Sequence, residues 1–184
     1  MRRFLIFAGV SVAFLVILGW VTQFFMLKYS KSFSPEKETA FQHGDLTIKV
    51  FYNRPYKKGR KIFGELVPYN EVWRTGANEA TTFETNKNLS IDGKTLPAGK
   101  YTLWTIPREE TWTVIFNAQY GQWGINSKGE ANRDPARDVL SAEIRAVEQE
   151  QEFEQFTIQF EEVGEEFEMV LLWDKTLVAI PMSY

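Results

Sequence analysis

The sequence predicts an all-β protein, an antiparallel sandwich or barrel-like domain of about eight strands, preceded by one transmembrane helix. An uncharged apolar run occupies residues 4–27, and short runs with apolar and polar residues in alternation fill most of the remaining chain. Aromatic residues make up 15% of the 184 residues, enough bulky side chains to fill a β core. No long amphipathic helix interrupts the alternating runs, so one β domain is expected over residues 44–184.

The apolar run reads FLIFAGVSVAFLVILGWVTQFFML. At about 1.5 Å per residue, a helix of this length crosses a hydrocarbon core of about 30 Å. Trp20, Phe24 and Phe25 gather toward its C-terminal end, where aromatic side chains suit the membrane interface. We therefore expect a short tail at residues 1–3 and a helix at 4–27 that has the lipid bilayer as its partner.

A cleaved signal peptide is the alternative interpretation, because Arg2 and Arg3 precede the apolar run. The run is longer than the usual apolar region of about 7 to 15 residues, and no A-x-A-like site follows it, which favours a retained anchor. The short N-terminal tail favours an inside N-terminus, so the protein is expected to be single-pass with its domain on the extracytoplasmic, periplasmic side. Residues 28–43 are mostly polar and are expected to form a juxtamembrane linker.

The first strand is expected over residues 45–52, where Leu46, Ile48, Val50 and Tyr52 alternate with other residues. Turn residues at Asp92-Gly93 and Pro97-Ala98-Gly99 separate strand-like runs and predict hairpins. The alternation recurs in four further runs, namely Trp112–Phe116, Leu140–Ala146, Phe156–Phe160 and Phe167–Trp173.

Residues 134–156 fit two interpretations. The Asp134-Pro135 start and the Ala, Glu and Arg content suit a helix. The alternation over residues 140–146 favours a strand, which we expect to follow a short helical turn at 135–138. The run EQEQEFE at 148–154 is expected to be a solvated face or a loop.

Composition excludes several classes of function. Of 21 Lys and Arg residues, 19 remain after Arg2 and Arg3 are set aside, against 24 Asp and Glu, a balance of −5 that argues against a nucleic-acid partner. Cysteine is absent, and His43 is the single histidine, expected at the surface. Because no Walker, Rossmann or zinc motif occurs, no cofactor and no metal is expected. Any catalysis would use carboxylates, Arg, Lys or Tyr.

Residues 52–82 depart from clean alternation and combine arginines, glycines, prolines and aromatics. Guanidinium groups bind planar anions through paired hydrogen bonds, an aromatic ring can form an apolar wall, and Glu79 could act as a base if burial raised its pKa. The candidate ligand-binding residues are Arg54, Arg60, Trp73, Arg74, Asn78 and Glu79. The alternative is that these residues form turns, internal ion pairs and core. The loop at 122–130 either covers a pocket or connects strands.

Several strings of this sequence carry a resemblance to a known family. They are YNRP at 52–55, GRKIFGELVPY at 59–69, VWRTGANEATT at 72–82, LPAGKY at 96–101, WTVIFN at 112–117 and QWG at 122–124. Together they resemble an uncharacterised bacterial family, number 2911 in the domain-of-unknown-function series, over about residues 44–180. The resemblance implies no activity and no catalytic residues. It does imply export, since relatives generally have a signal peptide, and a turn with positive φ at Asn70, where glycine is common in the family.

Three functions remain open from the sequence. The first is a membrane-anchored binding module for a small anionic or saccharide ligand. The second is an envelope hydrolase that uses a carboxylate near Glu79, although no carboxylate pair can be selected. The third is a structural subunit of an envelope assembly, whose aromatic residues would serve a protein interface.

Overall fold

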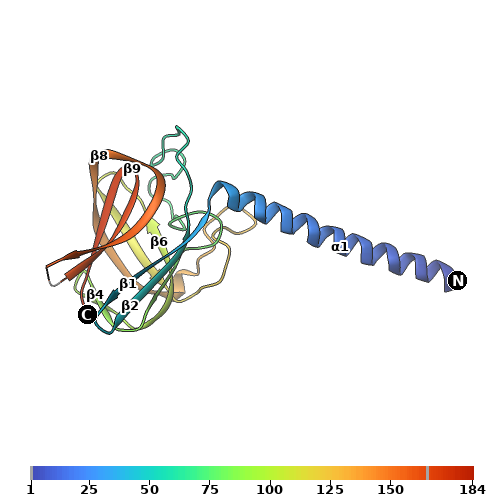
Figure 1. Cartoon of the computed structure of the whole chain (residues 1–184), viewed down its shortest axis with the longest axis horizontal. Coiled ribbons are helices and arrows are strands. Elements are labelled where there is room, and N and C mark those ends of the chain that lie inside the picture. Colours follow the sequence, from blue (N-terminus) through green and yellow to red (C-terminus); the bar gives the residue numbers. More distant parts are fainter. Residues whose placement is uncertain (1, 165) are drawn as a thin grey trace. The chain divides into compact units, whose positions relative to one another are not determined.

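The computed structural model describes residues 2–164 and 166–184, which divide into two compact units (Figure 1). The first contains helix α1 (Arg2–Phe33), which is longer than the expected 4–27. From Ser11 to Phe33 the helix is long and apolar enough to cross a membrane. Phe14, Trp20 and other large apolar side chains on it are exposed. The Thr22 hydroxyl donates to the Leu18 carbonyl at 2.6 Å, so this polar group is satisfied within the helix.

The second unit, Ser34–Tyr184, is built from antiparallel strands, which confirms the predicted fold class. One seven-stranded sheet curls into a half-barrel (Figure 1). Its strands in spatial order are β1 (Glu36–His43), β2 (Leu46–Asn53), β3 (Thr82–Thr85), β6 (Gly99–Ile106), β7 (Thr111–Asn117), β8 (Asp138–Val163) and β9 (Glu166–Met182). A separate hairpin consists of β4 (Leu89–Ile91) and β5 (Lys94–Leu96), joined at the predicted Asp92-Gly93 turn.

The long strand β8 curls the sheet, because it pairs with two partners in succession. Its first part, up to Arg145, pairs with β7, and the remainder pairs with β9. The chain that follows β2 then reaches the middle of β8, where the Phe156 amide donates to the Pro55 carbonyl at 3.0 Å. Tyr52 adds a side-chain link, since its hydroxyl accepts from the Ile158 amide at 2.9 Å and donates to the Ile158 carbonyl at 3.3 Å.

The expected juxtamembrane linker at residues 28–43 was wrong, because most of these residues form the end of α1 and strand β1. Helix α1 extends to Phe33, and Glu36–His43 pairs with β2 residue by residue. The strand was missed because Phe41 is its one buried residue, stacked on Phe160 at 5.3 Å and on Phe167 at 4.6 Å between ring centroids. An edge strand that buries one side chain has no apolar alternation.

Residues 134–156 form a short helical turn followed by a strand, as the alternation predicted. A 3₁₀ turn, Pro135–Arg137, is capped by the Asp134 side chain and leads directly into β8. Residues 148–154 belong to β8 and are not a loop, although the pairing with β9 shifts register on both sides of Phe153. Asn70 has a φ of 65°, which confirms the turn expected there.

The inner face of the half-barrel holds the main hydrophobic core. Trp73 stacks on Trp173 with ring centroids 5.9 Å apart and meets Phe156 edge-on at 5.1 Å. Phe63 and Trp112, whose ring centroids are 4.8 Å apart, complete this aromatic cluster. Such closely spaced offset and edge-to-face pairs add to the stability that comes from burial of their area.

The outer face of the sheet is covered at β6 and β7. Trp104 and Ile115 pair across these strands, alternate with the inner-core residues and are nevertheless buried. Val72, Ala80 and Ala131 pack on them. Two irregular parts of the chain therefore lie over this outer face: residues 72–81, called the 72–81 segment, and residues 118–137, called the 118–137 loop.

Replacement of Tyr52 by phenylalanine should lower the free energy of unfolding by about 1 to 3 kcal/mol, because the buried Ile158 amide loses its acceptor. Burial raises the pKa of the Tyr52 hydroxyl. When the pKa of a group is raised in the folded state, its contribution to stability is fully present below the unfolded-state pKa of about 10. This contribution is lost as the pH rises through the folded-state pKa. Urea titrations at about pH 7 and pH 11 should therefore show a smaller loss of stability at high pH in Tyr52→Phe than in the parent. An equal loss would contradict this role.

Candidate functional site

The 72–81 segment is fixed to β6 at both ends and forms a tight loop between them. Trp73 and Thr105 exchange backbone hydrogen bonds of 2.7 and 3.0 Å, and the Thr81 carbonyl accepts from the Leu103 amide at 2.8 Å. Within the loop, Thr75 and Asn78 have φ values of 52° and 57°. Each such left-handed residue costs about 1 to 2 kcal/mol without local compensation. The segment keeps this conformation because its surroundings hold it.

A buried amide network supports the end of this loop. Asn53, fully buried at the end of β2, donates from Nδ2 to Glu79 Oε2 at 3.0 Å. Its Oδ1 accepts from Asn78 Nδ2 at 3.2 Å. The backbone of Gly76 approaches the same residue, since a Cβ at Gly76 would lie 3.0 Å from the Asn53 carbonyl oxygen. Asn53 thus holds the two candidate residues Asn78 and Glu79 in place.

Arg74 lies beneath the 118–137 loop. Its neighbour Trp73 points into the inner core and Val72 packs in the outer cluster, so Arg74 belongs to the covered outer side. The Gly124 amide donates to the Asn78 carbonyl at 2.9 Å. A Cβ at Gly124 would lie 2.0 Å from Arg74 Cδ and 2.9 Å from the Asn78 carbonyl oxygen. The loop backbone therefore rests directly on the aliphatic part of Arg74, and a glycine is required for space.

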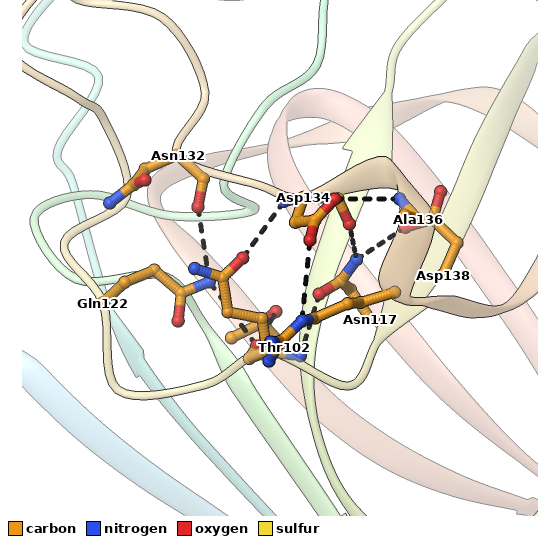
Figure 2. A network of polar contacts seen from close by, with 9 residues as sticks. Thr102, Asn117, Gln122, Asn132, Asp134, Ala136 and Asp138 are labelled. Atoms are coloured by element: carbon orange, nitrogen blue, oxygen red, sulfur yellow. Dashed lines mark hydrogen bonds and ion pairs between the residues drawn. The ribbon is translucent and has the colours of Figure 1, made fainter.

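The 118–137 loop is held over the sheet by polar contacts at its base (Figure 2). Asn117, fully buried at the end of β7, donates from Nδ2 to the Asp134 carbonyl at 2.8 Å and to Asp138 Oδ1 at 2.7 Å. Thr102 donates to the Gln119 carbonyl at 2.7 Å, and the Asp134 amide donates to Gln119 Oε1 at 3.0 Å. These bonds make the base of the loop a fixed part of the structure rather than a flexible connection.

Two buried polar atoms in this region have no hydrogen-bond partner among the residues that the structure describes: Arg74 Nε and Gln122 Oε1. Burial lowers the pKa of the Arg74 guanidinium, and no charged neighbour is among the causes of this change. Buried polar groups are almost always hydrogen-bonded, so an orphaned donor and acceptor in one region call for a physical explanation. The two residues lie on parts of the chain in direct contact, since the Ala80 amide donates to the Gln122 carbonyl at 3.2 Å.

The structure separates the six candidate residues. Arg74, Asn78 and Glu79 lie together in the 72–81 segment. Arg54 lies at the contact of β2 with β8, where its Nε donates to the Phe156 carbonyl at 3.0 Å and its Nη2 to Thr157 Oγ1 at 2.7 Å.

Arg60 and Trp73 do not lie with that group. Arg60 is exposed and bonds to the carbonyls of Tyr56 and Lys57 in its own turn, at 2.6 and 2.9 Å. Trp73 belongs to the inner core, and its Nε1 donates to the Gly76 carbonyl at 3.0 Å. The hydrogen bonds and packing of these two residues, like those of Arg54, are made within the fold.

Sequence reasoning missed the residues that contact the 72–81 segment, chiefly Asn53, Gln122 and Gly124. A signal was present in the strands beneath them, because Tyr101–Thr105 and Trp112–Asn117 are buried without alternation. A continuous buried run is typical of a strand covered on both faces. Among the described residues, no group of three or more His, Asp or Glu side chains is arranged to hold a metal ion.

One family profile, described as Protein of unknown function (DUF2911), matches residues 34–182. The chain belongs to this family. The DUF2911 match spans all nine strands, including β1, and leaves out α1. It contains both the 72–81 segment and the 118–137 loop, so the candidate site belongs to the DUF2911 domain. No curated protein and no solved structure matches the sequence.

Proposed function

We propose that this protein is a membrane-tethered binding module whose DUF2911 domain binds a small anionic ligand through Arg74. The observation that carries the proposal is the buried Arg74 Nε, which lacks a partner in the described structure. A guanidinium group presents five N–H donors in a fixed, planar arrangement that matches a carboxylate or a phosphate. An anion at Arg74 would satisfy the orphaned donor and offset the cost of burial.

Asn53, Asn78 and Glu79 act in this proposal as positioning residues. Their hydrogen bonds of 3.0 and 3.2 Å hold the end of the loop that carries Arg74. The strained backbone at Thr75 and Asn78 supports the same interpretation, because unusual φ values persist at sites where a side chain must be aimed. Glu79 is engaged with Asn53, and no observation favours a hydrolytic role for it.

The tether is helix α1, and we propose that the domain lies outside the cytoplasm. The exposed apolar side chains along Ser11–Phe33 support the tether, since a bilayer would cover them. The location of the domain rests on the short N-terminal tail, which favours an inside N-terminus. A binding domain on such an anchor samples ligands close to the membrane surface.

Arg74→Lys should weaken anion binding despite the retained charge, because an ammonium lacks the planar pair of donors. The full chain in detergent micelles is titrated with propionate and with inorganic phosphate by calorimetry. Loss of one charge-assisted hydrogen bond, about 1.5 to 3 kcal/mol, corresponds to about a tenfold or greater loss of affinity. Arg60→Lys is the matched control, since Arg60 is exposed and bonds within its own turn.

Two results would contradict the binding proposal. One is an unchanged affinity in Arg74→Lys. The other is an equal loss in Arg60→Lys, which would indicate nonspecific attraction of anions to surface charge.

Retention of the anchor is tested by the intact mass of protein purified from membranes. We expect the mature chain to retain residues 4–27, because no A-x-A-like processing site follows the apolar run. A start beyond residue 20 would show that the segment is a cleaved signal peptide and would remove the tether from the proposal.

A further inference from the structure

Gln122 supplies the second unpartnered atom of the region, and its orientation is fixed. Its Nε2 lies 3.5 Å from the Gln119 carbonyl and 3.4 Å from the Asn132 carbonyl, both of which accept hydrogen bonds (Figure 2). An amide group has donors on one side and an acceptor on the other. Because two carbonyl groups accept from the donor side, Oε1 points away from them. In that position Oε1 is buried and has no donor among the described residues.

The two orphaned atoms are complementary in chemistry. Arg74 Nε is a donor that needs an acceptor, and Gln122 Oε1 is an acceptor that needs a donor. A simple anion such as acetate would satisfy Arg74 and leave Gln122 unpaired. A neutral sugar could donate a hydroxyl to Gln122 but would leave the guanidinium charge without a counter-ion. A molecule with both a carboxylate and a hydroxyl meets both requirements.

We propose that the ligand is a small hydroxy acid, of which a uronic acid is the saccharide form, with its carboxylate on Arg74 and a hydroxyl on Gln122. This inference rests on the proposed anion-binding function and adds a second recognition group, supplied by the 118–137 loop. A pocket that hydrogen-bonds a ligand hydroxyl discriminates strongly against analogues without it, because the unpaired acceptor remains buried.

The backbone contacts explain how such a ligand is covered. Gly124 lies on Arg74, and the Asn132 amide donates to the Gly124 carbonyl at 3.1 Å, so residues 124–132 form a turn over the site. The base of the loop is fixed by Asn117 and Asp134. The part that must move to admit a ligand is therefore the turn at 124–132, whose tip, Ser127–Glu130, is exposed.

The experiment compares three probes on the full chain in detergent micelles: D-glucuronate, propionate and D-glucose. The parent protein should bind D-glucuronate about tenfold more tightly than propionate, and D-glucose more weakly than both. Gln122→Met keeps the length of the side chain and removes the acceptor together with the Nε2 donors to Gln119 and Asn132, so it should abolish the preference for D-glucuronate. Gln42→Met, on the exposed side of β1, is the matched control and should retain the preference.

The outcomes separate this inference from the proposed function. Equal affinity for D-glucuronate and propionate in the parent, with both weakened by Arg74→Lys, would overturn the hydroxy-acid inference and leave anion binding intact. A preference for D-glucuronate that survives Gln122→Met would also overturn it. Absence of binding by either acid would contradict both proposals. Melting temperatures of all variants, measured without probe, establish that each one is folded.

Discussion

Replacement of Trp73 by alanine is expected to lower the free energy of unfolding by about 4 kcal/mol. The side chain is 8% exposed and packs on Trp173 and Phe156 at the centre of the inner core. Truncation removes a large buried apolar surface and leaves a cavity that the rigid neighbouring rings cannot fill. The indole Nε1, which donates to the Gly76 carbonyl, is lost as well. Chemical denaturation measured by tryptophan fluorescence and by circular dichroism determines the change.

Trp123→Ala is the matched control for this prediction. Trp123 is half-buried in the 118–137 loop and forms a bridge with Glu79 through its backbone, which alanine retains. We expect Trp123→Ala to lower the free energy of unfolding by about 1 kcal/mol. If Trp73→Ala were as mild as the control and instead weakened anion binding, Trp73 would be the apolar wall of a pocket rather than a core residue.

Gly124→Ala should lower the free energy of unfolding by about 3 kcal/mol, the second largest effect expected. The new methyl group would lie 2.0 Å from Arg74 Cδ, and the backbone carbonyl of Asn78, 2.9 Å away, prevents a simple retreat of the loop. Overpacking of this kind typically costs about 1 to 3 kcal/mol. Because the clash is with the side chain that we propose as the anion receptor, the same variant should also lose affinity for propionate.

Two comparisons isolate the clash. Gly121→Ala is in the same loop, where a Cβ would meet no atom within 4 Å, so only its φ of 88° carries a cost, about 1 kcal/mol. In addition, Arg74→Ala removes Cδ, so the double variant Gly124→Ala with Arg74→Ala should be more stable than the sum of the single effects predicts. Strict additivity would show that the loop does not rest on Arg74.

The strands were predictable where one face of the sheet is solvated. In β2, Leu46, Ile48 and Val50 are buried and alternate with more exposed residues, so their period of two is visible in the sequence. Strand β1 was not predictable, since its single anchor Phe41 carries no period. The register shifts near Phe153 were hidden as well, because they are set by the pairing of β8 with β9.

The candidate site was predictable in part. The sequence singled out Arg74, Asn78 and Glu79 through the unusual composition of residues 52–82, and the structure brings these three together with Asn53. It also suggested Arg54 and Arg60, whose guanidinium groups bond elsewhere. An arginine in a turn-rich segment looks the same in sequence whether its acceptor is a local carbonyl, a distant strand or a ligand.

The sequence by itself determined the apolar N-terminal helix, the antiparallel β class and the helical turn ahead of β8, because these depend on composition and on local periodicity. The tertiary structure alone decided which arginine has a buried Nε without a partner among the described residues, and that Gly124 and Gln122 lie beside the segment that carries it. The physical reason is that hydrogen bonding and burial depend on contacts between residues about 50 positions apart, such as Arg74 with Gly124, and a sequence pattern does not record such contacts.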